Sequence, residues 1–156
     1  MPRQNVFIKI SGDLFERNSV LHAIAVLTQE YFVVVCIGGG TQINDTFQKR
    51  GFDLGKHGPL GRETNTFEER QVARDVLERN KAALQDLLAD RKIPATVIIP
   101  VLELGSVLSH VNGDTMIEAA YLGFDQLYVY TQSDRVQKKL ERFERLPKVQ
   151  VIGFSE

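Results

Sequence analysis

The chain has one cysteine, no tryptophan and no apolar run longer than a β-strand. A single cysteine excludes an internal disulfide, and Cys36 lies in an apolar segment, where it is most simply a small buried residue in a reducing compartment. The short apolar runs predict no membrane-spanning helix. The N-terminal sequence MPRQNVFIKI has neither the apolar region nor the cleavage site of a signal peptide. We therefore expect a cytoplasmic protein.

An excess of charge of one sign is also lacking. Lysine and arginine number 19 against 20 aspartate and glutamate, which gives a formal net charge of −1. We therefore expect neither a nucleic acid nor a membrane as a partner. The histidines and the cysteine do not have metal-ligand spacing, so we expect no protein metal site. A length of 156 residues fits a single domain, residues 1–156.

Apolar segments of strand length alternate with segments of helical periodicity along the chain. The predicted strands are 6–10, 32–37, 95–101, 126–131 and 149–154. The predicted helices are 18–28, 41–49, 66–90, 136–143 and one that opens in the turn 110–115 and ends at 123. We expect an irregular loop at 52–59 and a short helix at 102–109. This order predicts an α/β fold, a three-layer αβα sandwich with a mainly parallel sheet.

The most informative stretch is the apolar run 32–37 followed by Gly38, Gly39 and Gly40. Glycines after a buried parallel strand let the backbone approach a ligand, and the next helix turns its free N–H groups towards an anion, usually phosphate. The glycines are not spaced as in a dinucleotide site, and no P-loop lysine follows them. Taken alone, they are also compatible with a plain turn.

Other polar residues follow the remaining strands. Lys9 lies near the carboxyl end of the first strand, and Ser11 and Gly12 come directly after that strand, while Thr131 ends a later strand. Ligands of parallel sheets bind beyond the carboxyl ends of the strands, so we expect these residues to meet the three glycines there, together with Asp114. The simpler interpretation of Lys9 is a strand-end lysine that extends to solvent.

Two further positions have alternative interpretations. Arg62 lies in a glycine-containing loop, where it is either a clamp for a carboxylate or phosphate or a solvated side chain. Asn112 and Asp114 precede a helix, and capping that helix is the structural explanation for both. The functional explanation is an acidic group at a helix N-terminus that faces the same crevice as Lys9.

These residues together resemble the amino acid kinase superfamily. Residues 8–13 (IKISGD) resemble the K-L-S-G-E opening of bacterial uridylate kinases. Residues 38–44 (GGGTQIN) and 61–64 (GRET) resemble the G-G-G-P-x-I-N and G-x-R-x-T patterns of acetylglutamate kinases, and Asn80-Lys81 resembles their following N-K. Residues 111–114 (VNGD) resemble their V-N-A-D turn, and 125–131 resembles the A-D-x-L-x-x-T strand of the superfamily.

The resemblance implies phosphoryl transfer from ATP, with Mg, to a small carboxylate or phosphate acceptor. Lys9 would bridge the transferring phosphoryl oxygens, and Asp114 would orient Lys9 and the glycine loop. Backbone N–H groups near Ser11 and Gly12 and at 38–40 would bind phosphoryl and acceptor oxygens. Arg62 and Asn112 would hold the acceptor.

The resemblance also implies contacts to the nucleotide and to a second copy of the chain. Thr131 and Asp134 would contact the nucleotide, and the helix 67–89 would mediate a homodimer or higher homo-oligomer. Gln132 and Arg135 depart from the family's T-D-x-x-G-V loop, and no G-x-x-x-K segment with a second catalytic lysine follows. We therefore expect the nucleotide half of the site to be reduced or absent. Three hypotheses remain: a compact kinase, a kinase-derived binding or regulatory protein without catalysis, and a Rossmann-like domain with another ligand.

Overall fold

Five parallel strands form the main sheet of the protein, whose structure is a computed structural model that describes residues 3–155. In spatial order the strands are β5 (Thr96–Ile98), β2 (Phe32–Ile37), β1 (Asn5–Ile10), β8 (Gln126–Gln132) and β9 (Val149–Phe154). Each strand is parallel to its neighbours. Because β1 and β2 lie inside the sheet with both faces covered, their side chains are apolar almost without interruption.

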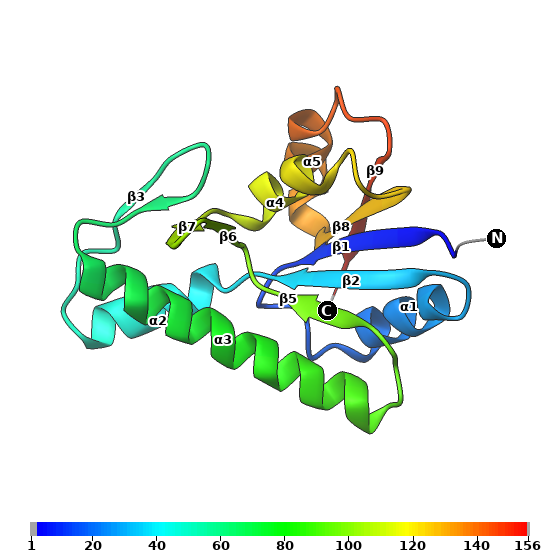
Figure 1. Ribbon diagram of the computed structural model, residues 1–156, viewed down its shortest axis with the longest axis horizontal. Helices are drawn as coiled ribbons and strands as arrows, with labels where there is room; N and C mark the ends of the chain where they lie inside the picture. The colour runs from blue at the N-terminus through cyan, green and yellow to red at the C-terminus, as the bar shows by residue number, and fades with distance from the viewer. Residues whose placement is uncertain (1–2, 156) are drawn as a thin grey trace.

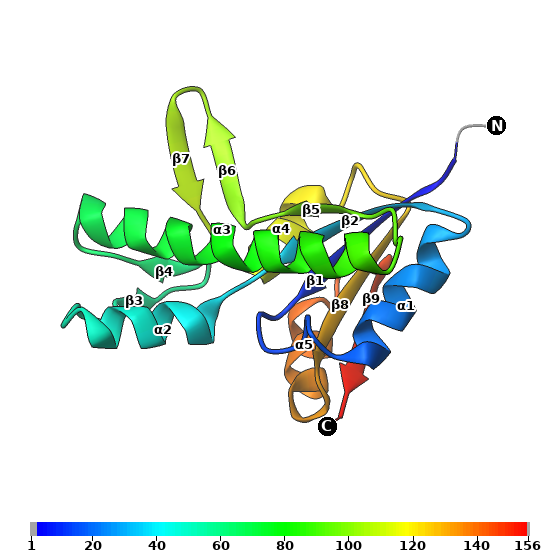
Figure 2. The same ribbon diagram turned by 90° about the horizontal axis from the view of Figure 1, so that it is seen from below.

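Helices cover both faces of this sheet, which confirms the predicted α/β class (Figures 1 and 2). The helices are α1 (Asn18–Thr28), α2 (Gly40–Lys49), α3 (Phe67–Asp90), α4 (Gly113–Ala120) and α5 (Val136–Arg142), with a 3-10 turn η1 (Ser133–Arg135) before α5. Side chains of α1 and α3 pack with Ile8 on one face of β1. Side chains of α4, together with Phe143 directly after α5, pack with Phe7 on the other face. Helix α2 lies beside α3 around Phe47.

The carboxyl ends of β1 and β2 point towards the side of the molecule that carries α2 and two small hairpins (Figure 1). One hairpin pairs β3 (Lys56–His57) with β4 (Arg62–Glu63), and the other pairs β6 (Val101–Leu104) with β7 (Val107–His110). The residues that we expect to bind a ligand should therefore lie at the carboxyl ends of these strands, beside α2 and the two hairpins.

The hairpins correct three of our predictions. Residues 102–109 do not form a short helix but most of the β6–β7 hairpin, in which Gly105 adopts a φ of +66° at the turn. A two-residue turn with positive φ favours glycine and closes a hairpin, and this signal outweighs the weak helical pattern. The predicted strand 95–101 is shorter, because Pro100 has no N–H to continue the ladder and the chain turns away into β6. The predicted loop 52–59 contains β3.

Helix α3 is the longest helix, and its start is well defined. The Thr66 hydroxyl accepts from the backbone N–H of Glu69, and the Glu69 carboxylate accepts from the backbone N–H of Thr66. This reciprocal capping box binds two donors that a helix start leaves free. Charged residues alternate with the apolar stripe of α3. Among residues 3–155, no helix combines the length and the apolar character that crossing a membrane requires.

Candidate functional site

The two glycine-containing turns lie against each other at the ends of β1 and β2. Lys9 is opposite Cys36 in the parallel register, and the N–H of Gly38 donates to the carbonyl of Ile10 at 2.9 Å. A Cβ on Gly12 would lie 2.8 Å from the carbonyl oxygen of Gly38. Only a residue without a side chain allows this approach of the two backbones.

Helix α2 begins at this junction with no side chain bound to its first N–H groups. Gly39 is the N-cap residue, no side-chain cap is present, and no acidic residue occupies the first turn. The free N–H groups and the positive end of the helix dipole favour an anion at this position. A Cβ added to Gly40 would meet nothing within 4 Å, so the space beside the first residue of the helix is open.

Two amides hold the glycine turns in place. The Asn80 side chain, which is buried on α3, donates to the carbonyl of Gly38 at 3.0 Å. The Gln42 side chain donates to the carbonyl of Gly12 at 3.0 Å, and its own oxygen accepts from Asn80 at 3.4 Å. This network links α3, α2 and both turns. It binds the carbonyl groups of the turns and not the N–H groups at the start of α2, which therefore remain available for an anion.

Asp114 on α4 is the centre of a cluster of cations beside the turns. Its carboxylate is 3.6 Å from Lys9 Nζ, 2.5 Å from Lys139 Nζ and 4.0 Å from Arg142 Nε. The side chains of Lys9, Lys139 and Asp114 are all largely buried. Asp114 Oδ1, which faces Lys9, accepts no hydrogen bond from any residue of 3–155. One carboxylate therefore faces three cations, and the cluster carries a net positive charge.

Burial and neighbouring charges shift the ionisation of this cluster. Burial lowers the pKa of Lys9, and Lys139 lowers it further, although Asp114 opposes both. Burial alone would raise the pKa of Asp114, but Lys9, Lys139 and Arg142 outweigh it and hold the pKa below its usual range. Asp114 is thus an anion at neutral pH. Burial raises the pKa of Cys36 to about 12, which makes this thiol an unreactive neighbour of Lys9.

Arg62 reaches the same region from the β3–β4 hairpin. Its guanidinium donates to the carbonyl of Leu54 and, at 2.6 Å, to the side chain of Asn44, and it lies 5.4 Å from the ring centroid of Phe47. The hairpin is held against α4 because the N–H of Asn112 donates to the carbonyl of Leu60 at 2.9 Å. Arg62 is thus an oriented side chain and not a freely solvated one.

A cavity of about 380 Å³ opens where these elements meet. Most of the residues that the sequence singled out line it, namely Lys9, Ser11, Gly12, Gly38, Gly39, Gly40, Arg62 and Asn112. Asp114 is buried behind Lys9. The Asn112 side chain caps α4 by accepting from the N–H of Thr115 at 2.7 Å, which is the structural role that we considered for it.

The two residues expected to contact a nucleotide lie elsewhere. Thr131 is buried within β8, opposite Gly153 of β9, and Asp134 is exposed in η1. Neither lines the cavity, whereas Arg135, the next residue in η1, does. The turn after β8 therefore contributes a cation where we expected an acid.

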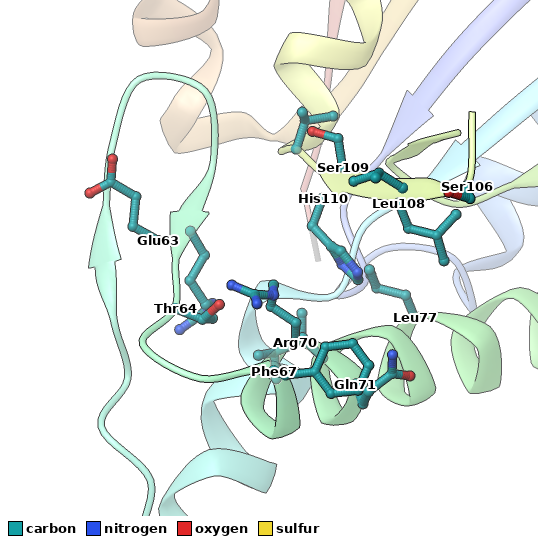
Figure 3. Close-up of a pocket in the computed structure, with 15 residues that line it drawn as sticks. Glu63, Thr64, Phe67, Arg70, Gln71, Leu77, Ser106, Leu108, Ser109 and His110 are labelled. Carbon is teal, nitrogen blue, oxygen red and sulfur yellow. The ribbon is translucent and has the colours of Figure 1, made fainter. Parts of the chain in front are cut away.

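A larger cavity, of about 800 Å³, adjoins the first between the start of α3 and the β6–β7 hairpin (Figure 3). Arg62, Ile43, Leu77 and Val111 line both cavities. The His110 imidazole points from β7 towards α3 in this view. Burial lowers the pKa of His110, and Arg74 and Arg70 lower it further, so this histidine is neutral at pH 7.

Sequence reasoning missed several of these residues. We dismissed Lys139 because it lacks the glycine-rich context of a family lysine, and its approach to Asp114 depends on how α5 packs on α4. Arg142 was not considered, and Arg135 was noted only as a departure from the family pattern and not as a residue of the site. For Gln42 there was one usable signal. It lies in the first turn of the helix that follows the three glycines, where its side chain can reach the backbone at Gly12.

The cavity's donors fit a phosphoryl group, since Lys9 and the free N–H groups of α2 supply charge and hydrogen bonds to oxygen. Among residues 3–155, no group of three or more acidic, histidine or cysteine side chains is arranged to hold a metal ion. A magnesium ion that accompanies ATP is usually held by phosphate oxygens and water with few protein ligands, so this arrangement fits Mg-ATP as well as a free anion.

Comparison with known proteins assigns the chain to no family. No protein-family model matches it. A search of curated proteins gave no significant match. The functional argument therefore depends on the site itself.

Proposed function

We propose that this protein is an amino acid kinase-like phosphotransferase that transfers a phosphoryl group from ATP to a small carboxylate or phosphate acceptor. The observation that carries the proposal is the pairing of Lys9 and Lys139 with one carboxylate, Asp114, beside an uncapped helix start. Phosphoryl transfer needs positioning and neutralisation of charge more than covalent catalysis. Two largely buried lysines, Lys9 in the cavity lining and Lys139 bound to Asp114, together with the free N–H groups, meet that need.

Each residue has a defined part in this proposal. Lys9 donates to the oxygens of the phosphoryl group, and the N–H groups at the start of α2 hold it in place. Asp114 keeps both lysines charged and fixed without neutralising them fully. When bound, ATP supplies the phosphoryl group. Lys139 answers the need for a second cation, whose loss in related chemistry costs about 10³–10⁵ in rate.

The acceptor side is supported by Arg62. Its contacts with Asn44 and Phe47 hold the guanidinium at the junction of the two cavities. An acceptor carboxylate or phosphate at this junction would lie between a fixed arginine and the glycine turns. Because the Arg62 side chain is already held in one orientation, less side-chain entropy is lost when the acceptor binds.

A second candidate is a kinase-derived protein that binds an anion without catalysis. It is favoured by one observation, that Thr131 and Asp134 do not line the cavity, which removes the contacts that the resemblance implies for a nucleotide. In this case the glycine turns and Lys9 would serve a free phosphate or a phosphorylated small molecule.

Calorimetric titration with Mg-ATP and with inorganic phosphate distinguishes the two. The wild type is compared with Lys9→Ala and with Lys49→Ala, which removes an exposed lysine at the far end of α2. Binding of Mg-ATP that only Lys9→Ala loses, together with transfer of labelled phosphate to a small acid or nucleoside monophosphate, supports the phosphotransferase. Phosphate binding without ATP binding or transfer supports the second candidate. Binding of neither at millimolar concentration contradicts both.

A further inference from the structure

We propose that the acceptor is a dianionic small molecule with an apolar or aromatic body, and that the cavity between α3 and the β6–β7 hairpin binds this body and its second anionic group. This inference rests on the proposed function, because it extends the acceptor from the glycine turns into the adjoining cavity. It concerns the part of the ligand that does not react.

The first argument is continuity. Arg62, Ile43, Leu77 and Val111 line both cavities, so the two cavities adjoin along these side chains and a molecule that extends past them would reach both. The larger cavity, of about 800 Å³, is in the range of small-molecule sites, whereas the smaller one, of about 380 Å³, is near the lower end of that range. An acceptor confined to the glycine turns would leave most of the space unused.

The second argument is the chemistry of the lining. Leu77 and Ala73 on α3 and Leu108 on β7 form apolar walls, and the Phe67 ring lies at the rim, where it is 68% exposed. A large aromatic side chain left this exposed beside a cavity loses water contacts when a flat or apolar ligand covers it. The cavity therefore suits a carbon skeleton or a ring better than a small hydrated ion.

The third argument is unbalanced positive charge. Arg70 lines the cavity and points into it, whereas the Glu63 carboxylate points away (Figure 3). Arg74 is close enough to His110 to lower the pKa of that histidine, as Arg70 does. Within residues 3–155, neither Arg70 nor Arg74 forms an ion pair. Arginine binds carboxylate and phosphate in a two-pronged geometry, so an anionic group on the ligand suits this end.

The three histidines provide separate reporters for a test by NMR. His57 lines the small cavity, His110 lines the large one, and His22 is exposed on α1, lining neither. Ring signals are assigned with His→Asn variants. The titrants are inorganic phosphate, phenyl phosphate and 4-carboxyphenyl phosphate, which add a ring and then a second anion to the same phosphoryl group.

We expect inorganic phosphate to shift His57 alone, and the two aryl phosphates to shift His57 and His110 while His22 stays constant. Phenyl phosphate should bind more tightly than phosphate, and 4-carboxyphenyl phosphate more tightly again. Arg70→Ala should remove the gain from the carboxylate, about tenfold for one charge-assisted contact, and leave the gain from the ring. Phe67→Ala should reduce the gain from the ring. Arg79→Ala, on the exposed side of α3, is the matched control.

The failures of the two proposals are distinguishable. Equal affinity for all three phosphates with His110 unmoved overturns the inference and leaves anion binding at the glycine turns intact. A carboxylate gain that Arg79→Ala removes as fully as Arg70→Ala also overturns it, because the effect is then general charge. A movement of His110 without one of His57 shows that the larger cavity binds the ligand alone, which contradicts the continuity with the glycine turns. No binding of any phosphate contradicts the anion site itself.

Discussion

The side chain of Lys9 crosses the first residue of α4 at a point where only glycine leaves room for it. A Cβ on Gly113 would lie 2.5 Å from Lys9 Cε and 2.8 Å from its Cγ. Both distances are shorter than any ordinary contact between carbon atoms. The position of the lysine amino group beside Asp114 thus depends on a missing side chain on the neighbouring element.

Gly113→Ala should weaken anion binding more than it lowers stability. The added methyl group displaces Lys9 from Asp114, but the lysine is flexible and can move, so the fold survives. We expect phosphate affinity measured by calorimetry to fall about tenfold, the value of one lost charge-assisted hydrogen bond. Gly123→Ala is the control, because its Cβ would meet its nearest atom at an ordinary 3.7 Å. Unchanged affinity in Gly113→Ala would show that Lys9 does not need this position.

Asp114→Asn should be strongly destabilising. The substitution leaves Lys9 and Lys139 buried close together without a counter-charge, and breaking a buried ion pair in this way costs about 3–5 kcal/mol of unfolding free energy. Glu118→Gln is the matched control, because Glu118 is on the same helix as Asp114 and its pair with Arg142 of α5 is more exposed, and surface pairs contribute about 0–1 kcal/mol. Urea unfolding measures both. Similar small losses would mean that water reaches the cluster freely.

Lys139→Met should weaken phosphate binding, whereas Lys138→Met should not. Removing the Lys139 amino group takes one positive charge from the cluster and leaves Asp114 free to draw Lys9 away from the anion. We expect a loss of about tenfold for one charge-assisted contact. Lys138 is its exposed neighbour on α5 and keeps the net charge of the two variants equal. Equal losses in both would assign the effect to overall charge.

Anion binding should decline at alkaline pH earlier than an ordinary lysine predicts. Burial lowers the pKa of Lys9 below 10.5, so the folded protein loses this charge first as pH rises. Sulfate, whose charge is constant across this range, is a suitable titrant, and its affinity should fall with a midpoint below 10.5. Lys9→Arg should remove this early decline, because guanidinium stays charged.

The lowered pKa of Lys9 affects stability in the direction opposite to its effect on anion affinity. The unfolded chain holds the Lys9 proton more tightly than the folded protein, so raising the pH from the folded pKa towards 10.5 favours folding. In that window the contribution of this group to unfolding free energy should rise with pH while anion affinity falls. Parallel declines in both quantities would contradict the assignment to Lys9.

Local signals in the sequence were sufficient to predict most strands of the main sheet and the helices that cover it. The bounds of α1 and β2 follow directly from the apolar spacing at 18–28 and 32–37. The β6–β7 hairpin did not follow, since its turn depends on a positive φ at Gly105 that competes with a helical pattern of equal length. When both strands of a hairpin are short, the sequence of the connecting turn specifies them more than the apolar periodicity of the strands does.

The site was predictable where it is built from strand ends and less so where helices dock. Parallel strands place their carboxyl ends together, so Lys9 and Gly38 could be brought together from the sequence alone. Lys139 could not, because its position depends on the packing of Phe143 and Met116 between α5 and α4. Nothing in a charged, exposed-looking helix indicates which of two adjacent lysines turns inward.

The position of β1 in the sheet has a consequence for synthesis on the ribosome. β1 pairs with β2 on one edge, but its other edge pairs with β8. Across 120 residues of chain, the backbone N–H of Asn5 donates to the Asp125 carboxylate and the backbone N–H of Asp125 donates to the Asn5 side chain. Until β8 has emerged, the first strand presents an unsatisfied, apolar edge, which is a hazard for aggregation. The cluster around Asp114 includes Lys139 of α5, which follows β8, so it is complete only after β8 has been synthesised.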